Sequence, residues 1–207
     1  MSSFLGPIHY WLYNKIQLQQ GIVEDIFSFG KQSGLSLQEE CDDKFGVAET
    51  GSLEEMIDLG NIHGWLQEKV SQVEYKYAYS VTQLLKKDIG TLDELKSILF
   101  KSGNDKGQLF KDTDFSIASI YKEITDNLLD GMPCDHANSL VNQNESELVW
   151  KRNVCVHAQY WNEVGGDIAI YYELRDAWMQ GFVQQCGLEL HKLDAVTYCI
   201  KKGEHHE

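Results

Sequence analysis

Two long stretches of the chain place an apolar residue at every third or fourth position, and this spacing constrains the fold more than any other feature. The first stretch covers residues 7–32 and the second covers residues 61–88. A spacing of about 3.6 residues is that of an α-helix with one buried face. Pro7 begins the first stretch, where its missing N–H group removes no helical hydrogen bond. Two long amphipathic helices are therefore predicted.

Weaker patterns predict shorter helices in the rest of the N-terminal part. They fall at residues 36–45, 52–58 and 91–101, and from Asp114 to about 128–133. The polar sequence KSGNDKGQ at residues 101–108 predicts a loop.

After Pro133 the pattern changes to alternation of apolar and polar residues, which is typical of strands. Residues 147–157 and 189–203 are predicted strands, and residues 162–186 between them a helix. We therefore expect an α+β fold. A helical bundle of residues 1–130 would pack on a small antiparallel sheet with a long helix in residues 131–207, the two parts forming one compact unit.

Charge and composition limit the partners. The 32 acidic residues outnumber the 18 basic ones and give a net charge of −14. Such a chain is unsuited to nucleic acid or to an anionic membrane, both of which require Lys and Arg. No apolar run reaches the roughly 18 residues of a membrane span, and no signal peptide is evident. We expect a cytoplasmic protein with a small-molecule ligand, and leave a homodimer open.

A short pattern, Ile-His-x-Trp-Leu-x-x-Lys, occurs near the start of both long helices. It contains His9 and Trp11 in the first copy and His63 and Trp65 in the second. Helical spacing places each histidine on the apolar face, near a helix N-terminus that favours its neutral form. These four residues are expected to line a ligand pocket. The alternative is a pair of hydrogen-bonded core histidines beside packing tryptophans.

A second repeated pattern is Cys-x-His, found as Cys134 with His136 and as Cys155 with His157. If the strand extends through residue 157, Cys155 and His157 point to the same face about 6.6 Å apart. Thiolate and imidazole are ligands that zinc favours and iron tolerates, so all four residues are candidate metal ligands. Zinc or iron is the expected ion, with haem less favoured. The alternative is that the cysteines are small buried apolar residues.

The C-terminal third resembles the L-2-amino-thiazoline-4-carboxylic acid hydrolase family and, more distantly, the vinyl-reductase-type ligand-binding domains. The resemblance covers residues 147–203. It rests on these residues: Cys155, Ala158, Trp161, Glu163, Gly165, Asp176, Ala177, Gly181, Phe182, Thr197 and Gly203. Val156 stands where the family has proline. The resemblance implies an α+β fold and hydrolysis of a C–N bond or a ring.

Three hypotheses for function follow. In the first, the protein is a hydrolase acting on a small heterocycle or amide, with Cys155 as nucleophile or metal ligand, His157 as its base or co-ligand, and Asp176 as orienting carboxylate. In the second, the same residues bind a metal, haem or small metabolite without catalysis, as a sensor or carrier. In the third, the chain is a structural partner protein. For Asp176 a salt bridge with Arg175 or Lys151 is the alternative to a catalytic role.

Overall fold

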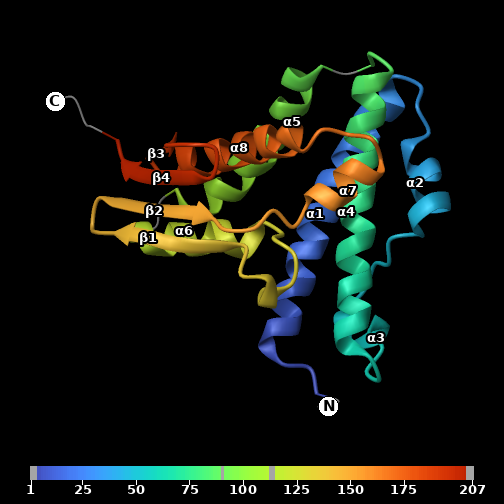
Figure 1. Ribbon diagram of the computed structural model, residues 1–207, viewed down its shortest axis with the longest axis horizontal. Helices are drawn as coiled ribbons and strands as arrows, with labels where there is room; N and C mark the ends of the chain where they lie inside the picture. The colour runs from blue at the N-terminus through green and yellow to red at the C-terminus, as the bar shows by residue number, and fades with distance from the viewer. Residues whose placement is uncertain (1–3, 90, 112–114, 204–207) are drawn as a thin grey trace. The chain divides into compact units, whose positions relative to one another are not determined.

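The computed structural model describes residues 4–89, 91–111 and 115–203 (Figure 1). Its contacts group these residues into two compact units that interleave along the chain. The first unit contains the chain up to Thr91 and two returning segments, residues 127–134 and 157–168. The second contains residues 92–126, residues 135–156 and the chain from Ala169 onward. This grouping differs from the single division near residue 130 that the sequence suggested.

The first unit is built around two long helices, α1 (Pro7–Gln32) and α4 (Ile62–Lys86), which pack against each other. Their facing sides bury the predicted apolar stripes, including Leu12, Val23, Leu66 and Val70. Three shorter helices complete the unit: α2 (Leu37–Phe45), α3 (Leu53–Met56) and α7 (Ala158–Glu163). Both α2 and α7 pack on α4, which is therefore the central element of this unit.

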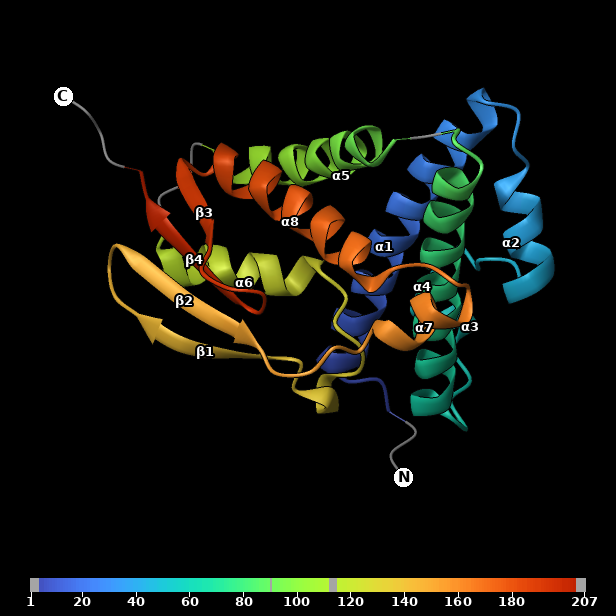
Figure 2. The ribbon, with the colours of Figure 1, turned by 45° about the horizontal axis from the view of Figure 1, so that its top comes forward.

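The second unit combines helices with a four-stranded antiparallel sheet (Figure 2). The strands lie in the order β1-β2-β4-β3. Their bounds are β1 (Asn138–Gln143), β2 (Glu147–Arg152), β3 (Leu188–Lys192) and β4 (Thr197–Lys202). The helices are α5 (Leu92–Gly107), α6 (Ile117–Asn127) and α8 (Ile168–Gln185), and a 3₁₀ turn at Gln108–Phe110 follows α5. A further 3₁₀ turn, Pro133–Asp135, begins in the first unit and ends in the second.

Aromatic contacts attach the helices of the second unit to one face of its sheet. Trp150 of β2 stacks on Tyr198 of β4, with ring centres 5.5 Å apart, and lies 5.2 Å from the ring of Tyr121 in α6. Tyr198 in turn donates a hydrogen bond to Asp176 of α8. Aromatic rings at such distances contribute beyond the area they bury.

The α+β prediction is confirmed, and the two long helices lie within two residues of their predicted bounds. Several local predictions are wrong. Residues 101–107 continue α5 instead of forming a loop, and Gly165, with φ of +69°, lies in a break that separates α7 from α8. The strand predicted to reach residue 157 ends at Arg152. The β-rich stretch of residues 189–203 does form strands, as an antiparallel hairpin of β3 and β4. Strand β1 was not predicted, and Asp114 lies outside the described residues.

In the described ranges of the chain, we find no helix of the length and apolarity that crossing a membrane requires.

Candidate functional site

The repeated Trp-Leu-x-x-Lys pattern forms the same contact at the start of α1 and of α4. The ammonium of Lys15 lies 3.9 Å from the ring centre of Trp11, and that of Lys69 lies 5.3 Å from Trp65. Residues four apart on a helix are neighbours, so each lysine covers its tryptophan in a cation–π pair. The leucines between them are buried. The repeat thus serves packing at two helix starts.

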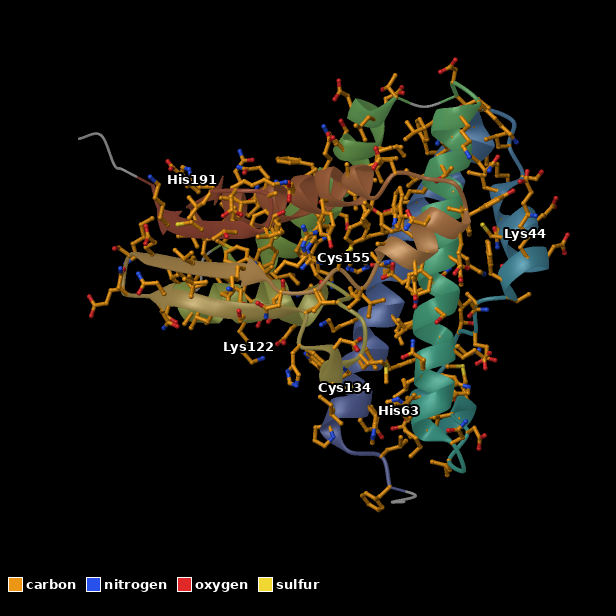
Figure 3. The ribbon with its side chains drawn as sticks, in the orientation of Figure 1. Lys44, His63, Lys122, Cys134, Cys155 and His191 are labelled. Carbon is orange, nitrogen blue, oxygen red and sulfur yellow. The ribbon has the colours of Figure 1, made fainter. Side chains whose placement is uncertain are left out.

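The two histidines of this pattern have different surroundings, and their predicted role in a ligand pocket stays a prediction. His63 is exposed, at the position marked in Figure 3, and Asn61 caps its helix by accepting a hydrogen bond from the Gly64 amide. His9 caps α1, because its Nδ1 accepts a hydrogen bond of 2.9 Å from the Gly6 amide. Free amides at a helix start attract such acceptors, and this need turns the first-turn histidine away from the buried stripe.

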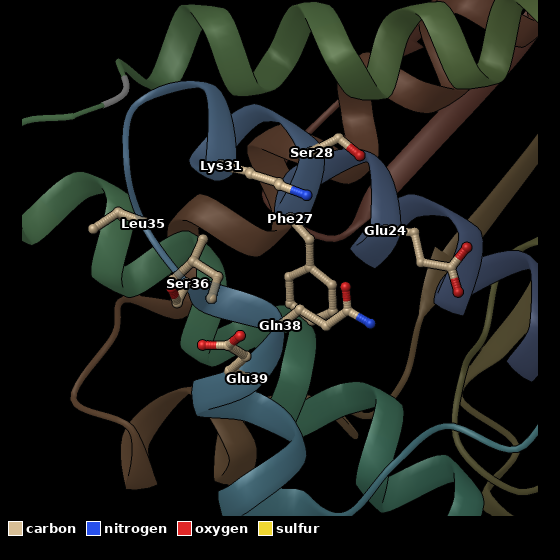
Figure 4. Close-up of a pocket in the computed structure, with 9 residues that line it drawn as sticks. Glu24, Phe27, Ser28, Lys31, Leu35, Ser36, Gln38 and Glu39 are labelled. Atoms are coloured by element: carbon tan, nitrogen blue, oxygen red, sulfur yellow. The ribbon is translucent and has the colours of Figure 1, made fainter.

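Trp65 does border a hollow, together with Tyr13 and Lys69. Its volume is about 20 Å³, which accommodates about one water molecule and no metabolite. A larger hollow of about 380 Å³ lies between α1 and the start of α2 (Figure 4). Its lining includes Phe27, Lys31 and Gln38. This hollow could not be predicted from the residue pattern, since it depends on the angle at which α2 returns along α1.

The residues of the two Cys-x-His patterns differ sharply in burial. Cys134, His136 and Cys155 are exposed, whereas the side chain of His157 is 2% exposed. Because β2 ends at Arg152, the expected shared strand face of Cys155 and His157 does not exist. Cys134 and His157 belong to the first unit, and His136 and Cys155 to the second. Among the described residues, no three His, Cys, Asp or Glu side chains are grouped to hold a metal ion.

His157 instead lies between two carboxylates in the interior of the first unit. Its Nδ1 is 3.0 Å from Oε1 of Glu74 in α4, and its Nε2 is 3.6 Å from Oδ1 of Asp130. The same Glu74 oxygen accepts a hydrogen bond of 3.2 Å from Gln19 of α1. The side chain of Glu74 is 1% exposed, and its Oε2 has no hydrogen-bond partner. This cluster therefore joins α1, α4, the segment at Asp130 and the start of α7.

The charge of His157 follows from these contacts. Burial alone would lower its pKa, but the carboxylates of Glu74 and Asp130 outweigh burial and raise the pKa above the ordinary value of 6.5. The imidazolium form is thus favoured, with both ring nitrogens directed at carboxylates.

The raised pKa of His157 predicts a pH dependence of stability. The folded protein binds this proton more tightly than the unfolded chain, so the stabilisation is complete below the unfolded pKa of about 6.5. It is lost as pH rises through the raised folded pKa. We expect the free energy of unfolding to fall from near-neutral to alkaline pH, measured by urea titration. In His157→Gln this fall should be smaller; an unchanged pH profile would contradict the assignment of charge.

A second cluster surrounds Cys155 in the second unit, where the chain has left β2 (Figure 3). The hydroxyl of Tyr172 in α8 donates a hydrogen bond of 3.1 Å to the exposed Sγ of Cys155. The guanidinium of Arg152 lies 3.5 Å from the centre of the Tyr172 ring. Its Nη2 donates to the carbonyl of Ala195, and its buried Nη1 has no hydrogen-bond partner among the described residues. The thiol of Cys155, the phenol of Tyr172 and the guanidinium of Arg152 therefore form one cluster of contacting side chains.

Asp176 lies one helical turn after Tyr172 and is held by two donors. It accepts hydrogen bonds from Lys192 at 2.7 Å and from Tyr198 at 2.8 Å. Burial and the negative charge of Asp176 together raise the pKa of Tyr198. The expected salt bridge of this carboxylate exists, but its partner is Lys192 of β3. Sequence analysis named Cys155 and Asp176 as candidate site residues. It did not name Tyr172 or Arg152.

Comparison of the chain with protein-family models, with curated proteins and with solved structures gives no match in any of the three. The resemblance of residues 147–203 to a hydrolase family therefore stays a prediction, as do the hypotheses of catalysis and of metal or metabolite binding.

Proposed function

We propose that the protein hydrolyses a C–N bond in a small heterocycle or amide, with Cys155 as the nucleophile. The observation that carries this proposal is the hydrogen bond from the Tyr172 hydroxyl to the exposed Sγ of Cys155. This contact places a proton donor directly beside an exposed nucleophilic atom. All five cysteines are free thiols, which suits a reducing compartment such as the cytoplasm.

The reaction can be written with the residues of this cluster. In an amide substrate, the Cys155 thiolate attacks the carbonyl carbon of the C–N bond to give a thioester, and the leaving nitrogen takes a proton from Tyr172. Water then cleaves the thioester, which restores the thiolate and returns a proton to Tyr172. The guanidinium of Arg152 stabilises the anionic form of Tyr172 from above its ring. His157 has no part in this scheme.

The first experiment measures hydrolysis of 2-amino-thiazoline-4-carboxylic acid and of a simple amide by the purified chain. We expect Cys155→Ser to lose activity at least about tenfold, and Tyr172→Phe to lose about tenfold because the proton donor is removed. Cys134→Ser is the matched control, since it removes another exposed thiol that lies outside the cluster. Wild-type rates in Cys155→Ser would refute the proposal.

A second measurement does not depend on the choice of substrate. Iodoacetamide should alkylate Cys155 faster than Cys134 at neutral pH, and Tyr172→Phe should remove this advantage. Equal rates for the two thiols in the wild-type chain would show that Tyr172 does not activate Cys155.

A further inference from the structure

Strand β1 forms one edge of the sheet, and its outer side has no strand beside it in the described sheet (Figures 1 and 2). An edge strand presents unpaired backbone N–H and C=O groups, which can pair with another strand. Proteins commonly protect such edges with charged side chains, proline or a bulge. The two edges of this sheet differ in that protection.

The opposite edge, β3, carries Glu189, His191 and Lys192. Strand β1 has the sequence NSLVNQ, with neither a charged residue nor a proline. Its central side chains are apolar and exposed, Leu140 at 49% and Val141 at 56%. An irregularity in its pairing with β2 lies between Leu140 and Asn142, and it is the one protective feature of the strand. An uncharged edge with two exposed apolar residues at its centre is notable on a chain whose net charge is −14.

The order of residues in β1 indicates what covers this edge. When a second copy of β1 runs antiparallel beside the first and the two strands share one centre, each residue of NSLVNQ lies opposite a residue of similar chemistry. Leu140 then lies opposite Val141, Ser139 opposite Asn142, and Asn138 opposite Gln143. Apolar side chains meet apolar ones, and hydroxyl and amide groups meet amides, which are favourable cross-strand pairs. No two like charges meet within the strand pair, in spite of the acidity of the chain.

We propose that β1 pairs with β1 of a second copy of this chain, in an antiparallel and isologous dimer. A twofold axis through the centre of the strand pair would join the two four-stranded sheets into one of eight strands. The exposed faces of Leu140 and Val141 would be covered by the same residues of the partner. This inference is independent of the proposed hydrolase activity.

The test is the mass of the full chain in solution, measured by light scattering between about 1 µM and about 1 mM, the range of micromolar to millimolar dissociation constants. We expect a concentration-dependent rise above the monomer mass of 23.7 kDa towards twice that value. Val141→Lys should raise the dissociation constant at least about tenfold, because it sets two like charges against each other across the axis. His191→Lys adds the same charge to the other edge and should leave it unchanged.

Amide hydrogen exchange supplies a readout that needs no variant. Protection of residues 138–143 should rise with protein concentration, while that of β3 stays constant. A chain that remains monomeric at about 1 mM, the outcome expected if a different protein supplies the strand, would overturn the proposal. So would a dimer that is unaffected by Val141→Lys or that leaves β1 unprotected.

Discussion

Replacing Glu74 with alanine is expected to destabilise the first unit by about 3–5 kcal/mol, the cost of breaking a buried ion pair from one side. The variant leaves the imidazolium of His157 in the interior, 2% exposed, without the carboxylate 3.0 Å away. It also removes the acceptor of the Gln19 side chain. The measurement is the free energy of opening from amide exchange in α4, because that element lies wholly within the first unit.

The chain contains a matched control for this prediction. His191 and Glu189 are also 3.0 Å apart, but their side chains are 41% and 50% exposed. Glu189→Ala therefore removes the same contact in water, where an ion pair contributes at most about 1 kcal/mol. The difference between the two variants isolates the effect of burial. If Glu74→Ala costs no more than Glu189→Ala, the His157 cluster does not stabilise the fold in the manner described.

The long helices could be predicted because their signal is local. The apolar stripes of residues 7–32 and 61–88 repeat within each segment, and no distant contact is needed to interpret them. The end of α5 shows the opposite case. Its sequence KSGNDKG is polar and glycine-rich, which is typical of a loop, yet Gly103 and Gly107 stand where α5 crosses the backbone of α8. A contact between distant segments thus overrides the local preference.

The candidate site was only partly visible for the same reason. Proximity in sequence suggested His157 as the partner of Cys155, but the partner found for its Nδ1 lies 83 positions away in Glu74. Buried imidazole needs acceptors, and a single sequence does not show which distant carboxylate supplies them. Tyr172 could have been found. It precedes the predicted Asp176 by one helical turn, so the two were bound to share a helix face.

Replacing Gly181 with alanine is the other substitution from which we expect a large effect. A Cβ atom added at Gly181 would overlap the carbonyl oxygen of Phe100 in α5 and lie 3.0 Å from the amide of Asn104. At Gly103 the added atom would overlap the carbonyl of Trp178. Both obstacles are backbone, so no side-chain rotation can relieve them and the two helices must separate.

Overpacking usually costs about 1–3 kcal/mol, and we expect Gly181→Ala to reach or exceed about 3 kcal/mol in the second unit, measured by amide exchange in α8. Gly21→Ala is the control, since Gly21 lies within α1 and nothing stands within 4 Å of its added Cβ. There alanine should stabilise the helix by about 0.5–1 kcal/mol. If Gly181→Ala destabilises the protein while Gly21→Ala stabilises it, the close crossing of α5 and α8 requires glycine at position 181, and the backbone flexibility of glycine is not the reason. Stabilisation by alanine at both positions would mean that α5 and α8 do not approach as closely as described.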